Sequence, residues 1–259
     1  MATTIWGTSS SWTLTALPLF VWMGEILFRT KLSENLFKGL SPWMQKLPGG
    51  LIHVNVVGCA LFAAISGSSA ATVATVGKMS IPELRKRNYP EKILLGSLAG
   101  SGTLGLLIPP SIILIIYGVA VQESIAKLFI AGIIPGIMIA LIFMSYVIIW
   151  SLINKKSMPK IIEEYSFFEK IKRSKQLLPV IILILAVIGS IYTGIATATE
   201  AASLGVVGAL ILSYFQKSLT LKTFKSSLLG ATKTSCMIAF ILAGSTFLSL
   251  AMGFTGLPW

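Results

Sequence analysis

The sequence is poor in residue types that metal sites and many enzymes require. It has 259 residues with no aspartate, one histidine and two cysteines, and only 12% of its residues are charged. His53 alone cannot build a histidine-based metal site. Cys59 and Cys236 both lie in apolar stretches, so we expect them to pack as small hydrophobic residues rather than form a disulfide or bind a metal.

The scarcity of charge also argues against a soluble domain, in which about 25% of residues are charged. Here 54% of the residues are hydrophobic and the mean hydropathy is +0.84. Long apolar stretches recur, which predicts an all-α polytopic membrane protein in a lipid bilayer. The expected spans cover 12–28, 128–153, 177–195, 201–215 and 234–254.

Catalysis and ATP hydrolysis are both disfavoured. A hydrolase within the membrane would need a nucleophile–base pair or a metal site, and the chain lacks aspartate, a second histidine and a cysteine cluster. It also contains no Gly-x-x-x-x-Gly-Lys-Ser/Thr loop, so coupling to ATP is not expected. We predict that the protein is not an enzyme and has no cofactor.

One short break organises the apolar sequence. The stretch Ser-Gly-Ser-Ser-Ala-Ala-Thr at 66–72 separates arms at 54–65 and 70–76, each too short to cross a bilayer. Polar backbone groups are tolerated at this depth only where protein or a water-filled cavity surrounds them. We therefore predict a re-entrant helical hairpin closing at 77–78; the alternative is an ordinary helix with small residues for close packing.

The distribution of basic residues favours the hairpin. The net charge is +12, from 21 Lys and Arg against nine Glu, and the basic residues lie between apolar segments, as in cytoplasmic loops rather than nucleic-acid sites. With a hairpin and an outside N-terminus, every basic residue except Lys127 lies inside. If the segment crossed the membrane completely instead, the basic residues would divide almost equally between the two sides, and the chain would not follow the positive-inside rule.

The remaining sequence divides into four parts. Residues 1–47 hold the first span and an amphipathic arm at 32–45, with Trp43 as an interfacial anchor. Residues 48–154 hold the hairpin, a broken helix and a span, and 155–176 form a basic cytoplasmic loop. Residues 177–259 hold spans and a second basic, amphipathic arm at 216–233.

The broken helix lies within 91–121. Gly-Ser-Gly-Thr-Leu-Gly at 100–105 and Pro109-Pro110 prevent a regular helix, because proline lacks an N–H and clashes with the preceding turn. Freed carbonyls and hydroxyls suit Na⁺, and half-helix N-termini suit a carboxylate. The alternative is local hydrogen bonding by Thr103 and Ser111 beside a packing kink.

Two sets of residues are candidates for this site. The predicted Na⁺ ligands, the only metal-binding group expected, are Ser66, Ser68, Ser69, Thr103, Gly105 and Pro109. The predicted substrate contacts are Ser69, Ala70, Thr72, Pro110 and Ser111. Glu25 and Glu200 lie nearest the apolar segments, but proton coupling is disfavoured, and an N-terminal helix role is favoured for Glu200.

Several motifs carry a resemblance to a known family. They are Gly-Ser-Ser-Ala-Ala-Thr-Val-Ala at 67–74, Gly-Thr-Leu-Gly-Leu-Leu-Ile-Pro-Pro-Ser at 102–111, Ala-Gly-Ile-Ile-Pro-Gly at 131–136 and Thr-Ala-Thr-Glu-Ala-Ala at 197–202. In this order they resemble the large membrane (permease) subunit of TRAP transporters, the DctM type. Ala198 stands where the family more often has proline.

The resemblance implies Na⁺-coupled import of an organic anion, such as a dicarboxylate, sialic acid or another carboxylate. It implies a bacterial inner-membrane protein with a periplasmic substrate-binding protein and a small DctQ-type membrane subunit as partners. The outside N-terminus favoured by the basic residues is then periplasmic, and no nucleic-acid partner is expected. The resemblance also implies an elevator motion. The alternatives are a permease of another sodium/anion symporter family and a non-transporting membrane scaffold fragment.

The resemblance further implies two inverted repeats, each with an arm, a hairpin and a broken helix. This chain contains the hairpin and the broken helix once. The second repeat is expected to start at 177 and to reach 259 without its hairpin, so we expect an incomplete inverted-repeat fold in an internal fragment or truncated product.

Overall fold

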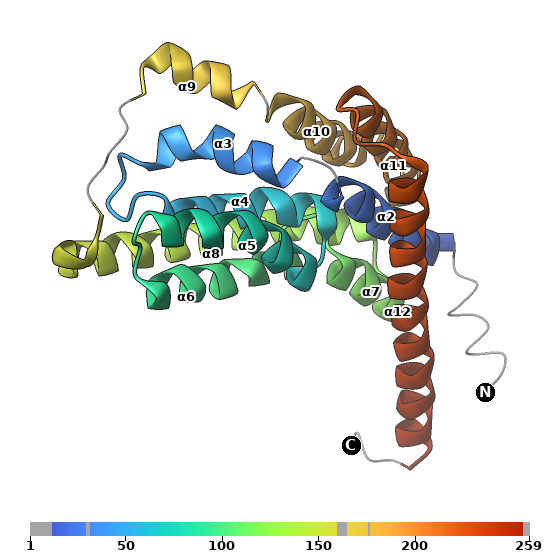
Figure 1. Cartoon of the computed structure of the whole chain (residues 1–259). Coiled ribbons are helices and arrows are strands. Elements are labelled where there is room, and N and C mark those ends of the chain that lie inside the picture. The colour runs from blue at the N-terminus through green and yellow to red at the C-terminus, as the bar shows by residue number, and fades with distance from the viewer. Residues whose placement is uncertain (1–11, 30–31, 160–164, 176, 256–259) are drawn as a thin grey trace.

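The computed structural model describes residues 12–29, 32–159, 165–175 and 177–255, and every regular element in these residues is a helix (Figure 1). The first is η1 (Trp12–Thr15), which leads into α2 (Ala16–Phe28). The predicted arm is present as α3 (Leu32–Met44), where Leu36 and Leu40 are buried. Trp43 is 41% exposed on the same helix.

A helical hairpin is present at the predicted place, formed by the packed helices α4 (Ile52–Ser66) and α5 (Ser69–Lys86), and its re-entry into a membrane stays a prediction. The chain turns at Gly67, whose φ of 59° is left-handed. The open end is closed by Tyr89, whose hydroxyl accepts a hydrogen bond from Leu51 N at 3.0 Å. The start of α4 therefore lies beside the end of α5.

The expected end of the hairpin at 77–78 is wrong, because α5 continues to Lys86. Gly77 does not end the helix, since it serves as a contact point: a Cβ there would lie 2.8 Å from a methyl carbon of Leu98. Lys78, Arg85 and Lys86 consequently lie on a helix rather than in a loop.

The break between 91 and 121 is confirmed. Helix α6 (Glu91–Gly102) passes into η2 (Thr103–Leu106), and α7 (Ile112–Val121) begins only after the prolines. Pro109 and Pro110 are both buried. Helix α6 packs against α4 and α5, so the broken helix covers one side of the hairpin.

The second half of the chain is more helical than expected. After α8 (Ile125–Ile153), the predicted loop contains η3 (Lys155–Ser157) and α9 (Phe167–Ser174), and α9 packs on α3 (Figure 1). Helix α9 begins with a capping box formed by Ser166 and Glu169. It is followed by α10 (Leu178–Tyr192) and α11 (Ala198–Phe215).

The predicted division between an arm at 216–233 and a span at 234–254 is wrong. Residues Leu221–Thr255 form a single helix of 35 residues, α12. The first arm is ended by a Pro-Gly-Gly turn, where Gly49 and Gly50 have φ of 102° and 55°. The second has only Gly230 near the expected boundary, and a lone glycine does not stop a helix.

The described residues contain three helices long and apolar enough to cross a membrane: α8, α11 and α12. A fourth is obtained if α9 and α10, bent by 57°, count as one broken span. The expected spans at 12–28 and 177–195 correspond to the shorter helices α2 and α10, of 13 and 15 residues. Much of the surface of α8 and α12 is exposed and apolar, as in a multi-pass membrane protein.

Helix α2 lies at the centre of the main apolar core. It packs against α11 and α12 on one side and against α4 on another. Phe20 meets Phe129 of α8 edge to face with ring centroids 6.0 Å apart. Two segments far apart in sequence, the hairpin and the C-terminal helices, are therefore held by one short helix.

Candidate functional site

The tip of the hairpin is a compact group of hydroxyl and carbonyl oxygens. Ser68 caps α5, and its Oγ accepts a hydrogen bond from Ala71 N at 3.4 Å. Thr72 Oγ1 donates to Ser68 O at 2.8 Å and lies 3.0 Å from Ser66 Oγ. Ser68 and Thr72 are one helical turn apart at the start of α5, and the left-handed turn at Gly67 brings Ser66 at the end of α4 beside them.

The broken helix lies directly against this tip. A Cβ on Gly105 would lie 3.0 Å from Ser68 C and Ser69 N, so any larger residue would require the backbone at the tip to shift by a few tenths of an ångström. On the other side, Ile112 N donates a hydrogen bond to Gly67 O at 3.3 Å. The structure therefore brings the two predicted halves of the site together through backbone atoms.

Ser69 has the most informative side chain at the tip. Its Oγ is buried and has no hydrogen-bond partner. A buried hydroxyl without a partner costs roughly 1–3 kcal/mol, and native proteins satisfy nearly all such groups. An oxygen in this position, next to Gly105, is suited to bind a ligand that supplies the missing interaction.

Three helix ends meet at the tip. Helix α4 ends at Ser66, α5 begins at Ser69 and α7 begins at Ile112. The C-terminus of α4 carries partial negative charge and favours a cation, while the N-termini of α5 and α7 carry partial positive charge and favour an anion. The arrangement provides adjacent places for both signs of charge.

The other predicted ligands are placed less uniformly. Thr103 is exposed, and its hydroxyl donates to Gly100 O at 2.7 Å, in the last turn of the preceding helix α6. Ser111 is buried, and its hydroxyl donates to Leu106 O at 2.7 Å across the unwound segment. Pro110 O would lie 2.7 Å from a Cβ on Gly67, and Ala70 is exposed in the first turn of α5. The structure thus brings Pro110 to the tip, while the hydroxyls of Thr103 and Ser111 bond locally.

Sequence reasoning missed a third element behind the tip. A Cβ on Gly24 of α2 would lie 2.9 Å from Ser66 Cα and 3.4 Å from Ile65 O. The sequence hints at this contact only through a glycine within the apolar segment 12–28, and a glycine alone does not identify the segment on which it packs. Asn55 was also missed: its amide nitrogen donates to Leu94 O and Ser97 Oγ, joining α4 to α6.

The acidic residues near the apolar segments have structural partners. Glu25 forms an ion pair with Arg29 one turn later. Glu200 accepts a hydrogen bond from Thr197 N at 2.8 Å in a capping box at the start of α11. The N-terminal helix role favoured for Glu200 is confirmed. His53 Nε2 lies 2.8 Å from Pro48 O, beside the turn that opens the hairpin.

Comparison with known proteins gives a consistent result. The model of the family described as "Tripartite ATP-independent periplasmic transporter, DctM component" matches residues 1–259. The C4-dicarboxylate TRAP transporter large permease protein DctM of Pseudomonas aeruginosa is 34% identical over 247 residues, covering 95% of this chain and 57% of that protein.

Relatives named for other substrates match equally well. The sialic acid TRAP transporter permease protein SiaT of Haemophilus influenzae is 34% identical over 239 residues, covering 92% of this chain and 38% of that protein. The 2,3-diketo-L-gulonate TRAP transporter large permease protein YiaN of Escherichia coli is 33% identical over 253 residues, covering 95% and 57%. The chain spans about half the length of the curated large permease proteins it matches.

Proposed function

Because the chain belongs to the DctM component family of tripartite ATP-independent periplasmic transporters, we propose that it serves in Na⁺-coupled import of an organic anion. Its relatives are transporter permeases rather than enzymes. The observation that carries the proposal is the buried, unpartnered hydroxyl of Ser69 at a hairpin tip that packs on the broken helix.

In this proposal, Na⁺ binds between the hairpin tip and the unwound segment. Ser66, Ser68 and Ser69 supply oxygens at the negative end of α4, and the backbone at Gly105 and Pro109 supplies the opposite side. Sodium prefers such hydroxyl and carbonyl oxygens, and broken helices provide them in secondary transporters. Thr103 would join only if its hydroxyl turned away from Gly100 O, to which it now donates.

The anion is proposed to bind next to the cation. The positive ends of α5 and α7 are aimed at this region, and Ser69, Ala70, Thr72, Pro110 and Ser111 lie in or before their first turns. A carboxylate is the matching group. The names of the relatives support a carboxylate such as a C4-dicarboxylate, sialic acid or a related acid.

The setting we propose is the bacterial inner membrane, with the N-terminus of this chain on the periplasmic side. The hairpin would enter and leave the bilayer on the cytoplasmic side, where the basic residues at its open end meet the positive-inside rule. A periplasmic substrate-binding protein would deliver the anion, and a small DctQ-type membrane subunit would complete the scaffold for an elevator motion.

Cation binding can be tested on the purified chain by thermal unfolding in detergent. NaCl is titrated against choline chloride at constant ionic strength, with KCl as the second cation. We expect Na⁺ alone to raise the melting temperature. Ser69→Ala should weaken apparent Na⁺ affinity by about tenfold or more, since a hydrogen bond or ligand to a charged group contributes roughly 1.5–3 kcal/mol.

Ser80→Ala is the matched control, because Ser80 Oγ is also buried without a partner on α5. It lies eleven residues from Ser69, about 16 Å along the helix at 1.5 Å per residue. Equal stabilisation by Na⁺ and K⁺, or equal effects of the two variants, would refute the proposed site. Re-entry is tested separately with Lys46→Cys and Lys78→Cys, which should be labelled from the same membrane face.

A further inference from the structure

Basic side chains from three segments line one cavity near the open end of the hairpin. Lys38 of α3, Lys78 of α5 and Arg173 of α9 border a cavity of about 510 Å³, together with Glu83 and Arg87. Arg87 Nε donates to Glu83 Oε1 at 2.8 Å. Among the described residues that line it, the cavity therefore has four basic side chains and one carboxylate, Glu83, which is paired with Arg87.

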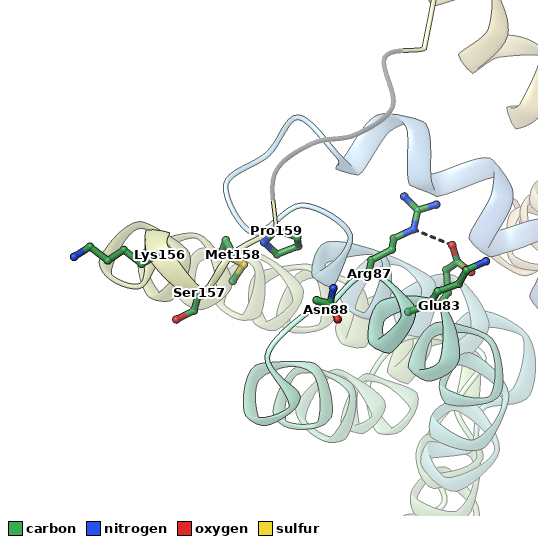
Figure 2. A pocket seen from close by; sticks show the side chains of 8 residues that line it. Glu83, Arg87, Asn88, Lys156, Ser157, Met158 and Pro159 are labelled. Carbon is green, nitrogen blue, oxygen red and sulfur yellow. Dashed lines mark hydrogen bonds and ion pairs between the residues drawn. The ribbon is translucent and has the colours of Figure 1, made fainter.

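A second cavity adjoins the first at the same ion pair. It measures about 560 Å³, and Glu83 and Arg87 line both cavities. Lys86 and Lys156 add two further positive charges on this side. Figure 2 shows the ion pair between Glu83 of α5 and Arg87, the residue that follows this helix, together with the segment 156–159 that follows α8. Positive charge is thus concentrated over several neighbouring elements.

The cavities lie at one end of a helix long enough to span a membrane. Helix α8 has 29 residues, which corresponds to about 43 Å at 1.5 Å per residue. The hydrocarbon core of a bilayer is only about 30 Å thick. A membrane-spanning α8 therefore extends beyond the hydrocarbon core, and the cavity lined by Lys156 lies beside its C-terminal end.

Apolar side chains border the same basic groups. Phe37, Met79 and Pro82 line the first cavity. On α9, Phe167 and Phe168 are 69% and 79% exposed beside its basic residues. A soluble anion needs no apolar border, whereas a phospholipid presents a phosphate and acyl chains side by side. Charge and apolar surface together match an anionic lipid.

We propose that the cavity lined by Lys38, Lys78 and Arg173 binds the phosphate headgroup of an anionic phospholipid. Its acyl chains lie along Phe37 and Met79. Since the three basic residues belong to α3, α5 and α9, the bound lipid links the amphipathic arm to the hairpin and to the segment between the two halves of the chain. The site is separate from the hairpin tip, so it stands whether or not the tip binds Na⁺.

The test uses the full 259-residue chain in detergent micelles, titrated with phosphatidylglycerol or phosphatidylcholine and followed by native mass spectrometry. The variant Lys78→Gln/Arg173→Gln removes two of the lining charges. A basic residue near an anionic lipid contributes roughly a fivefold factor in affinity, so we expect about 25-fold weaker binding of phosphatidylglycerol. The single variant Lys78→Gln, at an exposed position, should weaken it about fivefold.

Lys92→Gln/Lys222→Gln is the matched control, because both lysines are exposed and neither lines the two cavities. It should retain binding within about twofold of the unmodified chain. The proposal is overturned if the control loses as much affinity as the cavity variant, if the cavity variant binds normally, or if phosphatidylcholine binds equally well. Displacement of the lipid by an equal concentration of inorganic phosphate would also overturn it, since the cavity would then take a soluble anion.

Discussion

The turn of the hairpin provides the most demanding test of the geometry, through the variant Gly67→Ala. Gly67 has a φ of 59°, a conformation that costs an alanine roughly 1–2 kcal/mol. The added Cβ would also lie 2.7 Å from Pro110 O and 3.0 Å from Ile112 N. Relief of such a contact must move backbone, because neither atom belongs to a flexible side chain.

The expected loss of stability follows from these two terms. Forcing extra volume into a packed site costs roughly 1–3 kcal/mol. Added to the roughly 1–2 kcal/mol for the left-handed conformation, this lowers the free energy of unfolding by about 2–5 kcal/mol. Movement of the tip would also weaken the bond from Ile112 N to Gly67 O. For a chain of this size, 1 kcal/mol shifts the melting temperature by about 2–4 °C. We therefore expect the melting temperature to fall by about 4–20 °C in detergent.

Gly96→Ala is the matched control. Gly96 lies within α6, and nothing is found within 4 Å of the position its Cβ would take. Alanine should stabilise this helix by up to about 1 kcal/mol. If Gly67→Ala unfolds within about 2 °C of the unmodified chain, the close packing of the tip on the unwound segment is wrong.

Three further changes test other contacts. Gly105→Ala places a Cβ 3.0 Å from Ser68 C and Ser69 N. It should therefore lower the free energy of unfolding by about 1–3 kcal/mol and reduce the rise in melting temperature that Na⁺ produces. A Na⁺ titration that matches the unmodified chain would refute a site shared by the hairpin tip and the unwound segment. Burial raises the pKa of Tyr89 above its ordinary value, so the folded chain holds this proton more tightly than the unfolded chain. That contribution to stability is complete below about pH 10 and is lost as the pH rises through the raised pKa. Tyr89→Phe should therefore make the alkaline fall in melting temperature less steep, and an unchanged alkaline profile would contradict this. Trp43 packs on Phe167 and donates a hydrogen bond to Ser174. Trp43→Ala should therefore speed tryptic cleavage in α9 about fivefold or more. Cleavage at the rate of the unmodified chain would show that other contacts hold α9 in place.

Two boundaries in the first half were predictable because several prolines and glycines occur together there, whereas the lone Gly77 does not end α5. The Pro-Gly-Gly turn at 48–50 separates α3 from α4, and the paired prolines at 109–110 separate η2 from α7. The second half has no comparable sequence near 230, and there the predicted boundary failed because α12 continues through it. Local stop signals, rather than hydropathy, determined which boundaries could be found.

The contacts of the site were less predictable than its elements. The hydroxyl residues at 66–72 identified the tip, but Gly24, about 40 residues earlier, contacts Ser66 only in the folded chain. The packing of α9 on α3 could not be predicted either, because the sequence of a short basic segment with Phe167 and Ile171 is as typical of a loop as of a helix. Tertiary packing decides such cases, and no single-sequence pattern encodes the partner.

Three glycines from separate elements bring the tip together: Gly24, Gly67 and Gly105 each lie where a Cβ would contact backbone of another segment. The tip is thus positioned by backbone packing, while the buried, unpartnered hydroxyl of Ser69 is the group that we propose as the Na⁺ ligand. These roles separate experimentally. A glycine variant should lower stability even without Na⁺, because it moves the tip, whereas Ser69→Ala should leave stability without Na⁺ unchanged or higher and remove only the response to the ion. If Ser69→Ala destabilised the Na⁺-free chain as much as Gly105→Ala does, the hydroxyl would be a packing group, and the assignment of Ser69 as a ligand would fail.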